Sequence, residues 1–140
     1  MAAERDGPEG VLEVVHVDLR PGPHAPADAR RATCEALRRW ELPALVDRVV
    51  LVVSELVTNS VRYGRPPLSL DLRRLRSCVR VDVHDTVPEE PVLHDRASVD
   101  DDRESGRGLL IVTAVADEVG VEQVDGDGKH VYASFHTSDG

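Results

Sequence analysis

The chain is poor in aromatic and in basic residues, and both shortages argue against a nucleic-acid-binding protein. Aromatic residues make up 3% of the 140 residues, too few for a platform on which unpaired bases stack. The 17 Lys and Arg are outnumbered by 26 Asp and Glu, which gives a formal net charge of −9. A DNA- or RNA-binding protein needs a basic face that neutralises phosphates. We therefore expect no direct nucleic-acid partner.

Long apolar runs and paired cysteines are also missing. The apolar runs Val49–Val53 and Leu109–Val112 are far shorter than the roughly 20 residues that cross a bilayer. The first residues are charged and carry no apolar leader segment. Cys34 and Cys78 lie far apart, and neither has a second metal ligand at zinc spacing. We expect free thiols, a cytoplasmic protein and no membrane partner.

Lysine, asparagine and glutamine each occur only once, as Lys129, Asn59 and Gln123. The single lysine does not stand in a Gly-x₄-Gly-Lys-Ser/Thr motif, which excludes a P-loop. The length fits one domain, which we place at residues 11–137 after a flexible tail, residues 1–10.

Hydrophobic periodicity predicts five strands and three helices. Strands are expected at residues 11–19, 68–73, 79–85, 119–124 and 130–135. Helices are expected at residues 27–40, from just after Pro43 to about Tyr63, and at 106–117. Strands that are neighbours in sequence form hairpins, so the sheet should be mostly antiparallel, with the helices on one face. The predicted fold is an α/β (α+β) two-layer sandwich.

Three polar features interrupt this pattern. Glu55 and Asn59 are four residues apart on the apolar central helix, so they share one face; a solvent-facing helix edge is the alternative. Asp85 takes the inward position after Val81 and Val83, where a buried carboxylate needs a donor. The alternative is that the strand frays and Asp85 reaches solvent.

A glycine motif precedes the third helix, where backbone N–H groups can point at an anion. Such Gly-x-Gly turns are common, so the motif alone is a weak signal. Its residues are Gly106, Arg107, Gly108 and Leu109.

Taken in order, these features resemble the N, G1 and G2 boxes of the GHKL ATP-binding family, which includes gyrase and the histidine kinases. The N box corresponds to residues 54–64, SELVTNSVRYG, and is similar above all to the anti-sigma factor serine/threonine kinases. The G1 box begins at Asp85 and the G2 box at Gly106. The resemblance covers residues 11–135. It implies the Bergerat fold, a mixed, mostly antiparallel sheet with three helices on one face.

The resemblance also implies roles for these residues. Asn59 would coordinate the Mg²⁺ that bridges the phosphates of ATP, and Glu55 would be the general base that deprotonates a Ser/Thr hydroxyl or a water. Asp85 would accept a hydrogen bond from the adenine amino group. The residues of the G2 box would close on the phosphates: Gly106, Arg107, Gly108 and Leu109.

Two stretches depart from the family pattern. Asp85 is followed by Thr86-Val87-Pro88-Glu89, where the family usually continues Asp-x-Gly-x-Gly. The last strand has Gly128-Lys129-His130 where the family often has Gly-Lys-Thr. Because alternation buries Val131, Ala133 and Phe135, we expect His130 on the opposite face of that strand.

The resemblance implies an anti-sigma factor type protein kinase that sequesters a sigma factor and phosphorylates an anti-sigma factor antagonist; it also allows a homodimer. The altered G1 box keeps two alternatives open. One is a non-catalytic module that binds ATP or docks a partner. The other is a degenerate domain whose pocket is filled by side chains.

Overall fold

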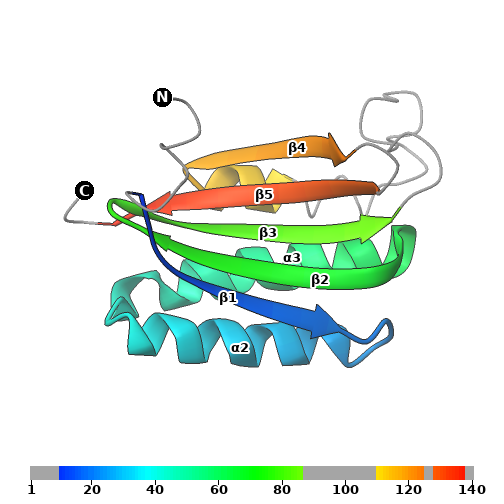
Figure 1. The fold of residues 1–140 in the computed structure, drawn as a ribbon, viewed down its shortest axis with the longest axis horizontal. Helices are drawn as coiled ribbons and strands as arrows, with labels where there is room; N and C mark the ends of the chain where they lie inside the picture. The colour runs from blue at the N-terminus through cyan, green and yellow to red at the C-terminus, as the bar shows by residue number, and fades with distance from the viewer. Residues whose placement is uncertain (1–9, 87–109, 125–127, 138–140) are drawn as a thin grey trace.

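In the computed structural model, the described residues are 10–86, 110–124 and 128–137, and they form a five-stranded sheet in the order β1-β2-β3-β5-β4 (Figure 1). Every strand pairing among them is antiparallel. The strands are β1 (Val11–Leu19), β2 (Arg65–Leu75), β3 (Cys78–Thr86), β4 (Glu118–Val124) and β5 (Gly128–His136).

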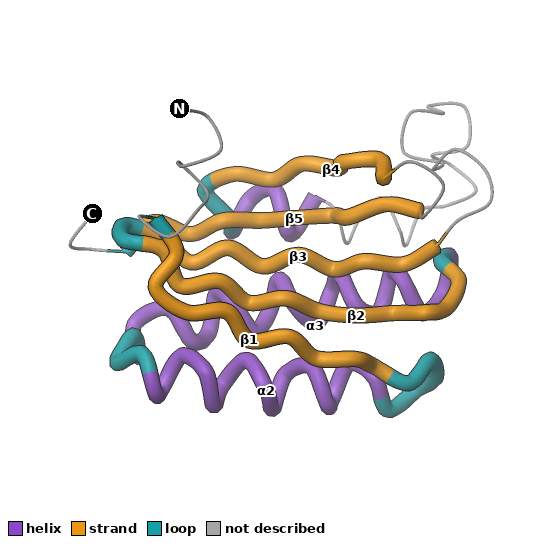
Figure 2. The backbone as a smooth tube through the Cα atoms, viewed as in Figure 1, coloured by secondary structure: helices purple, strands orange, loops and turns teal. Residues whose placement is uncertain are grey.

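The helices lie together on one face of this sheet (Figure 2). They are α2 (Ala25–Arg39), the single 3₁₀ turn η1 (Pro43–Leu45), α3 (Val46–Tyr63) and a helical segment at residues 110–115. The predicted two-layer fold is confirmed. The predicted tail, residues 1–10, lies outside the described residues except for Gly10, and so do the connection at 87–105 and the start of the third helix.

Two of the predicted boundaries that were wrong lie at prolines. Ala25 and Pro26 belong to the first turn of α2 rather than to the preceding loop, because the first turn of a helix needs no proline N–H. Pro66-Pro67 was expected to lie between α3 and the next strand, but β2 already begins at Arg65. The register with β3 shifts between Arg65 and Ser69, and an irregular stretch of this kind tolerates residues that cannot donate to the ladder.

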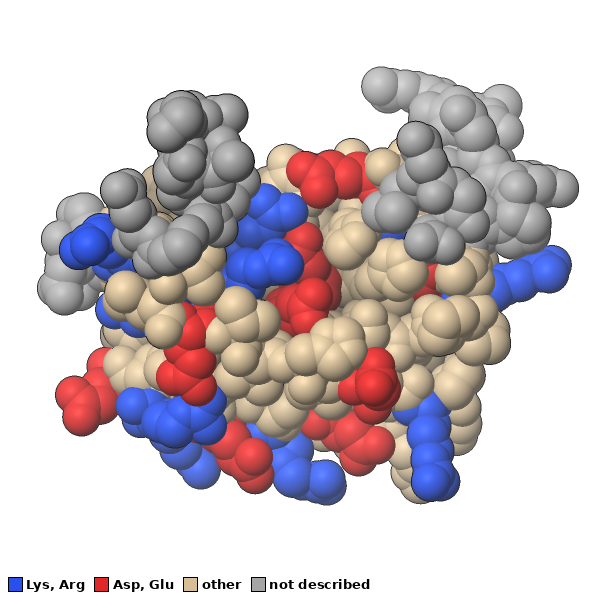
Figure 3. Space-filling model, viewed as in Figure 1, with Lys and Arg blue, Asp and Glu red and all other residues tan. Residues whose placement is uncertain are grey.

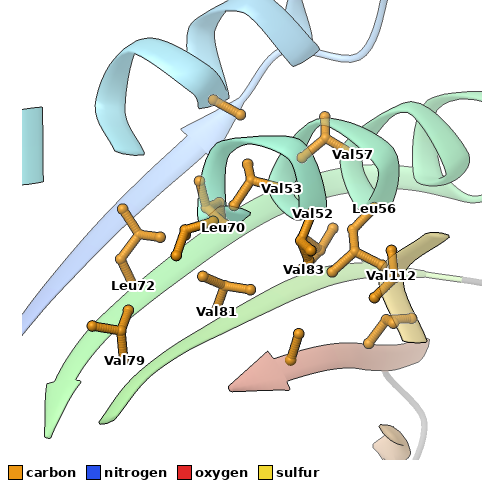
Figure 4. Close-up of a cluster of buried hydrophobic side chains, with 14 of the residues drawn as sticks. Val52, Val53, Leu56, Val57, Leu70, Leu72, Val79, Val81, Val83 and Val112 are labelled. Carbon is orange, nitrogen blue, oxygen red and sulfur yellow. The ribbon is translucent and has the colours of Figure 1, made fainter. Parts of the chain in front are cut away.

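The core fills the space between α3 and the sheet. Val52 and Leu56 point toward the strands, Val53 and Val57 are buried in the same cluster, and Val112 of the segment 110–115 closes it (Figure 4). The facing strand residues alternate along β2 and β3 and are all 1% exposed or less: Leu70, Leu72, Val79, Val81 and Val83. The alternation read from the sequence therefore marks the face that packs on the helices.

The replacement Leu72→Ala should destabilise the fold by about 2–5 kcal/mol, because it leaves a cavity in this core. The matched control is Leu12→Ala on β1, where the side chain is 56% exposed; its effect should stay within about 0.5 kcal/mol. Urea unfolding of both variants measures the difference. Equal midpoints for the two would contradict the assignment of the packed face.

The helix-free face of the sheet carries charged side chains among uncharged ones, and acidic and basic groups lie side by side near its centre (Figure 3). Asp82, 2% exposed, accepts hydrogen bonds from Arg73 at 3.0 Å and from both Nε and Nη2 of Arg80 at 2.9 Å. Arg80 also stacks on Tyr132, 4.1 Å from the ring centre. These pairings compensate the cost of burying the Asp82 carboxylate.

His16 of β1 lies at the edge of the same face. Its Nδ1 is 2.5 Å from Asp71 and its Nε2 is 2.8 Å from Asp18. Hydrogen bonding to Asp71, and secondly to Asp18, raises the pKa of His16. A raised folded-state pKa means that the protonated form contributes stability below the unfolded pKa of about 6.5, and that this contribution disappears as pH rises through the folded-state pKa.

His16→Gln should therefore lower stability at pH 6 and match the wild type at pH 9. Because His16 is about half exposed, the loss should stay below about 1 kcal/mol. Thermal unfolding of both proteins across this pH range tests the sign. A gap that grows toward alkaline pH would refute it.

Candidate functional site

The site residues predicted on the central helix lie along one edge of α3. Glu55 and Asn59 are both half-buried, while the apolar residues between and beside them pack on the sheet. Arg48 precedes Glu55 by seven residues and Asn59 by eleven, so the three project within about 40° of one another. The expectation that Glu55 and Asn59 share a face is confirmed; the edge is neither fully buried nor freely solvent-facing.

Arg48 shows what lies beside this edge. Its Nη2 and Nε donate to the carbonyl oxygen of Val115 at 2.8 and 3.3 Å, and its guanidinium lies 5.5 Å from the ring centre of Phe135. Val115 ends the helical segment 110–115. Arg48 therefore ties the end of the segment 110–115 to the first part of α3, on the edge that carries Glu55 and Asn59 further along the helix.

The predicted G2 box cannot be placed in the same way. Gly106, Arg107, Gly108 and Leu109 lie outside the described residues. The described part of the third helix starts directly after them, at residue 110. Their assignment to the phosphates stays a prediction.

Asp85 lies next to the end of β3 and is 1% exposed. The alternative of a frayed strand with a solvated carboxylate is therefore wrong. Ser60 of α3 donates its hydroxyl to Asp85 Oδ2 at 2.6 Å. Lys129 of β5 donates from Nζ to Oδ1 at 2.8 Å and to Oδ2 at 3.0 Å. Since Ser60 follows Asn59 directly, this contact brings the strand end to the helix that carries the N box.

Gly64 shows how closely α3 approaches this carboxylate. The helix was predicted to end before Gly64, and it does. However, the backbone of Gly64 is not left-handed, since its φ is −91°. A Cβ at this position would lie 2.4 Å from Asp85 Oδ2, so the absence of a side chain is required by close approach.

Two residues of this cluster were missed by sequence reasoning. The last strand was predicted to begin at His130, but it begins at Gly128, and Asp85 pairs directly with Lys129. Lys129 consequently points to the same face as Val131. Extending the alternation of Val131, Ala133 and Phe135 by two residues toward the N-terminus would have predicted Lys129 on this face. Ser60 continues the apolar stripe of Val53, Leu56 and Val57, so a polar residue on a buried stripe was the available signal.

His130 behaves as its alternation predicts. It lies on the helix-free face, with its ring centre 4.7 Å from that of His84 and its Nδ1 3.8 Å from Asp82. A cavity of about 390 Å³ opens on that face, with Arg80, Asp82 and His130 among its lining residues. The cavity is thus separated from Asp85 by the sheet, and its charged side chains pair with one another. We do not place the functional site there.

The described residues contain no cluster of three or more His, Cys, Asp or Glu that could hold a metal ion by itself. This agrees with the chemistry expected of Mg²⁺, which keeps several waters and takes one or two protein oxygens together with substrate phosphates. Asn59 offers such an oxygen on the half-buried edge of α3. The predicted metal end of the site therefore fits Mg²⁺, whereas the carboxylate predicted to bind the base already has partners.

The fold and these residues agree with a comparison against known protein families. The family of histidine kinase-like ATPase domains matches residues 19–135, most of the chain, and the chain belongs to this family. The predicted GHKL-type domain is confirmed, and membership in an ATPase domain family implies ATP binding. No curated protein matches the chain. Among the helices of the described residues, none has the length and apolar character to cross a membrane.

The buried Asp85–Lys129 pair should be strongly coupled in stability. Asp85→Asn and Lys129→Met each leave one partner uncompensated, at a cost of about 3–5 kcal/mol. The double variant should be less destabilised than the sum of the two, which a double-mutant cycle by urea unfolding measures. The control Arg31→Met removes an exposed pair with Asp28, 3.5 Å long, and should cost less than about 1 kcal/mol. Simple additivity at Asp85 and Lys129 would contradict the coupling.

Proposed function

We propose that this protein is an ATP-binding regulator of the anti-sigma factor type, a serine/threonine protein kinase that phosphorylates an anti-sigma factor antagonist and sequesters a sigma factor. Membership in the family of histidine kinase-like ATPase domains supports ATP binding. The N-box sequence SELVTNSVRYG supports the branch. We propose a cytoplasmic location and a homodimer on the same resemblance.

The observation that carries the proposal is the placement of Glu55 and Asn59. They share the half-buried edge of α3, to the first part of which Arg48 ties the end of the segment 110–115. Phosphoryl transfer depends on positioning and charge neutralisation rather than on covalent chemistry by the protein. A carboxylate and an amide fixed one helical turn apart, beside the helix that follows the G2 box, can supply both.

The proposed roles divide between these two residues. Mg-ATP supplies the phosphoryl group when bound. Asn59 provides an amide oxygen to Mg²⁺, and Glu55 accepts the proton of the attacking Ser or Thr hydroxyl. Gly106, Arg107, Gly108 and Leu109 bind the phosphates through backbone N–H groups and the Arg107 side chain.

A second candidate function is a non-catalytic module that acts by docking a partner. The pairing of Asp85 with Lys129 favours it, because the carboxylate proposed to bind adenine is already occupied. The absence of the usual glycines after Asp85 points the same way. The two candidates differ in whether phosphate is transferred, and the same experiment decides between them.

Glu55→Gln should lower phosphate transfer from Mg-ATP to the antagonist by about 10²–10⁴-fold, since the general base is lost. ATP affinity, measured by calorimetry, should change little in this variant and should fall in Asn59→Ala. The matched control is Glu35→Gln on the exposed surface of α2. Transfer that survives Glu55→Gln would overturn the catalytic assignment. Wild-type protein that binds ATP without any transfer would favour the docking module.

A further inference from the structure

We propose that Lys129 is an internal occupant of the base-binding position, and that a nucleotide base reaches Asp85 only after Lys129 has left it. The inference rests on the proposed role of Asp85 in binding adenine. It adds that nucleotide binding and the Lys129–Asp85 ion pair exclude each other.

Asp85 has no free approach in this structure. Its carboxylate is 1% exposed. Ser60 and the Gly64 backbone cover it from α3, as the 2.6 Å hydrogen bond and the 2.4 Å Cβ approach show. Lys129 binds both oxygens from β5. Ser60 on α3 and Gly64 directly after it are held in place by the packing of the helix on the sheet. The lysine is therefore the neighbour that can move.

The Lys129 side chain is placed so that it can leave Asp85. It is 11% exposed, so this ammonium on a flexible four-carbon stem is not fully enclosed by the protein. Such a stem lets the charged head swing out into water. The backbone of Lys129 is fixed by its pairing with Asp85 across the ladder, so release requires side-chain rotation and no change of the sheet.

The Lys129 ammonium and a nucleotide base compete for the same carboxylate. An ammonium gives a carboxylate a charge-assisted hydrogen bond, which is about twice as strong as one from a neutral donor. An exocyclic amino group of a base is a neutral donor. When it replaces the ammonium, the hydrogen bond to Asp85 becomes weaker. Binding must therefore draw on contacts elsewhere, on the phosphates and Mg²⁺, to open the pair. Ligand affinity is reduced by the fraction of protein in which Lys129 is released.

The chain offers a direct probe of this release, because Lys129 is its single lysine. Reductive methylation with formaldehyde modifies accessible amines, and the N-terminal amine provides an internal reference in the same sample. Lys129 should react slowly in the free protein. Saturating Mg-ATP should accelerate its modification, relative to the N-terminus, by about tenfold or more, in step with the released fraction. Asp85→Asn should accelerate it without nucleotide.

Slower or unchanged modification of Lys129 in the ATP-bound protein would overturn the inference, since the lysine would then remain in place, either at Asp85 or on a ring nitrogen of the base. Calorimetry with Mg-ATP gives the second measurement. Lys129→Met should bind ATP more tightly than the wild type, Lys129→Arg should not, and the control Arg31→Met should match the wild type.

The outcomes separate this inference from the proposed function. ATP binding by the wild type, with equal or weaker binding by Lys129→Met, overturns the inference and leaves the proposed function intact. If neither the wild type nor Lys129→Met binds ATP, both the inference and the proposed function are overturned. The methylation experiment on the wild type needs no variant, so instability of Lys129→Met does not decide the question.

Discussion

The packing of α3 on the sheet determines where the described site residues lie. Its apolar stripe runs through Val53, Leu56 and Val57 into the core, and the next position of that stripe is Ser60, which meets Asp85. Glu55 and Asn59 lie along one edge of the same helix. A shift of one residue would rotate every side chain by about 100°, so the contacts that stabilise the fold also fix the geometry of the site.

Strand β3 carries two buried carboxylates on opposite faces, and their partners differ. Asp82 is held by Arg73 and by both ends of the Arg80 fork, a planar geometry that is already organised for a carboxylate. Asp85 is held by one lysine and one hydroxyl. Breaking the first pairing needs two arginines to move together. Breaking the second needs one flexible chain to rotate, which suits a position where a ligand replaces a side chain.

The sequence was sufficient for the elements and for the helical half of the site, because both follow local periodicity. Alternation placed Val79, Val81 and Val83 correctly on the helix face, and the four-residue spacing placed Glu55 with Asn59. The sequence was insufficient to predict the partners of Asp85. The pairing with Lys129 joins residues 44 positions apart in the chain through a strand register, and register depends on which hairpins meet in the sheet rather than on any local pattern. The boundaries predicted at prolines 26 and 66–67 were wrong for the opposite reason. Proline was taken as a local breaker, but the first turn of a helix and an irregular strand start both permit it.

The two ends of the proposed site therefore depend on different parts of the chain. The metal and catalytic end depends on one edge of α3, which the core fixes. The base end depends on side chains at the ends of β3 and β5, where a single substitution changes the occupant of Asp85 without disturbing α3. Loss of the glycines after Asp85 and the presence of Lys129 both fall at this second end. Nucleotide affinity can accordingly change in such a domain while Glu55 and Asn59 keep their geometry, so weak nucleotide binding alone would not show that the catalytic end has been lost.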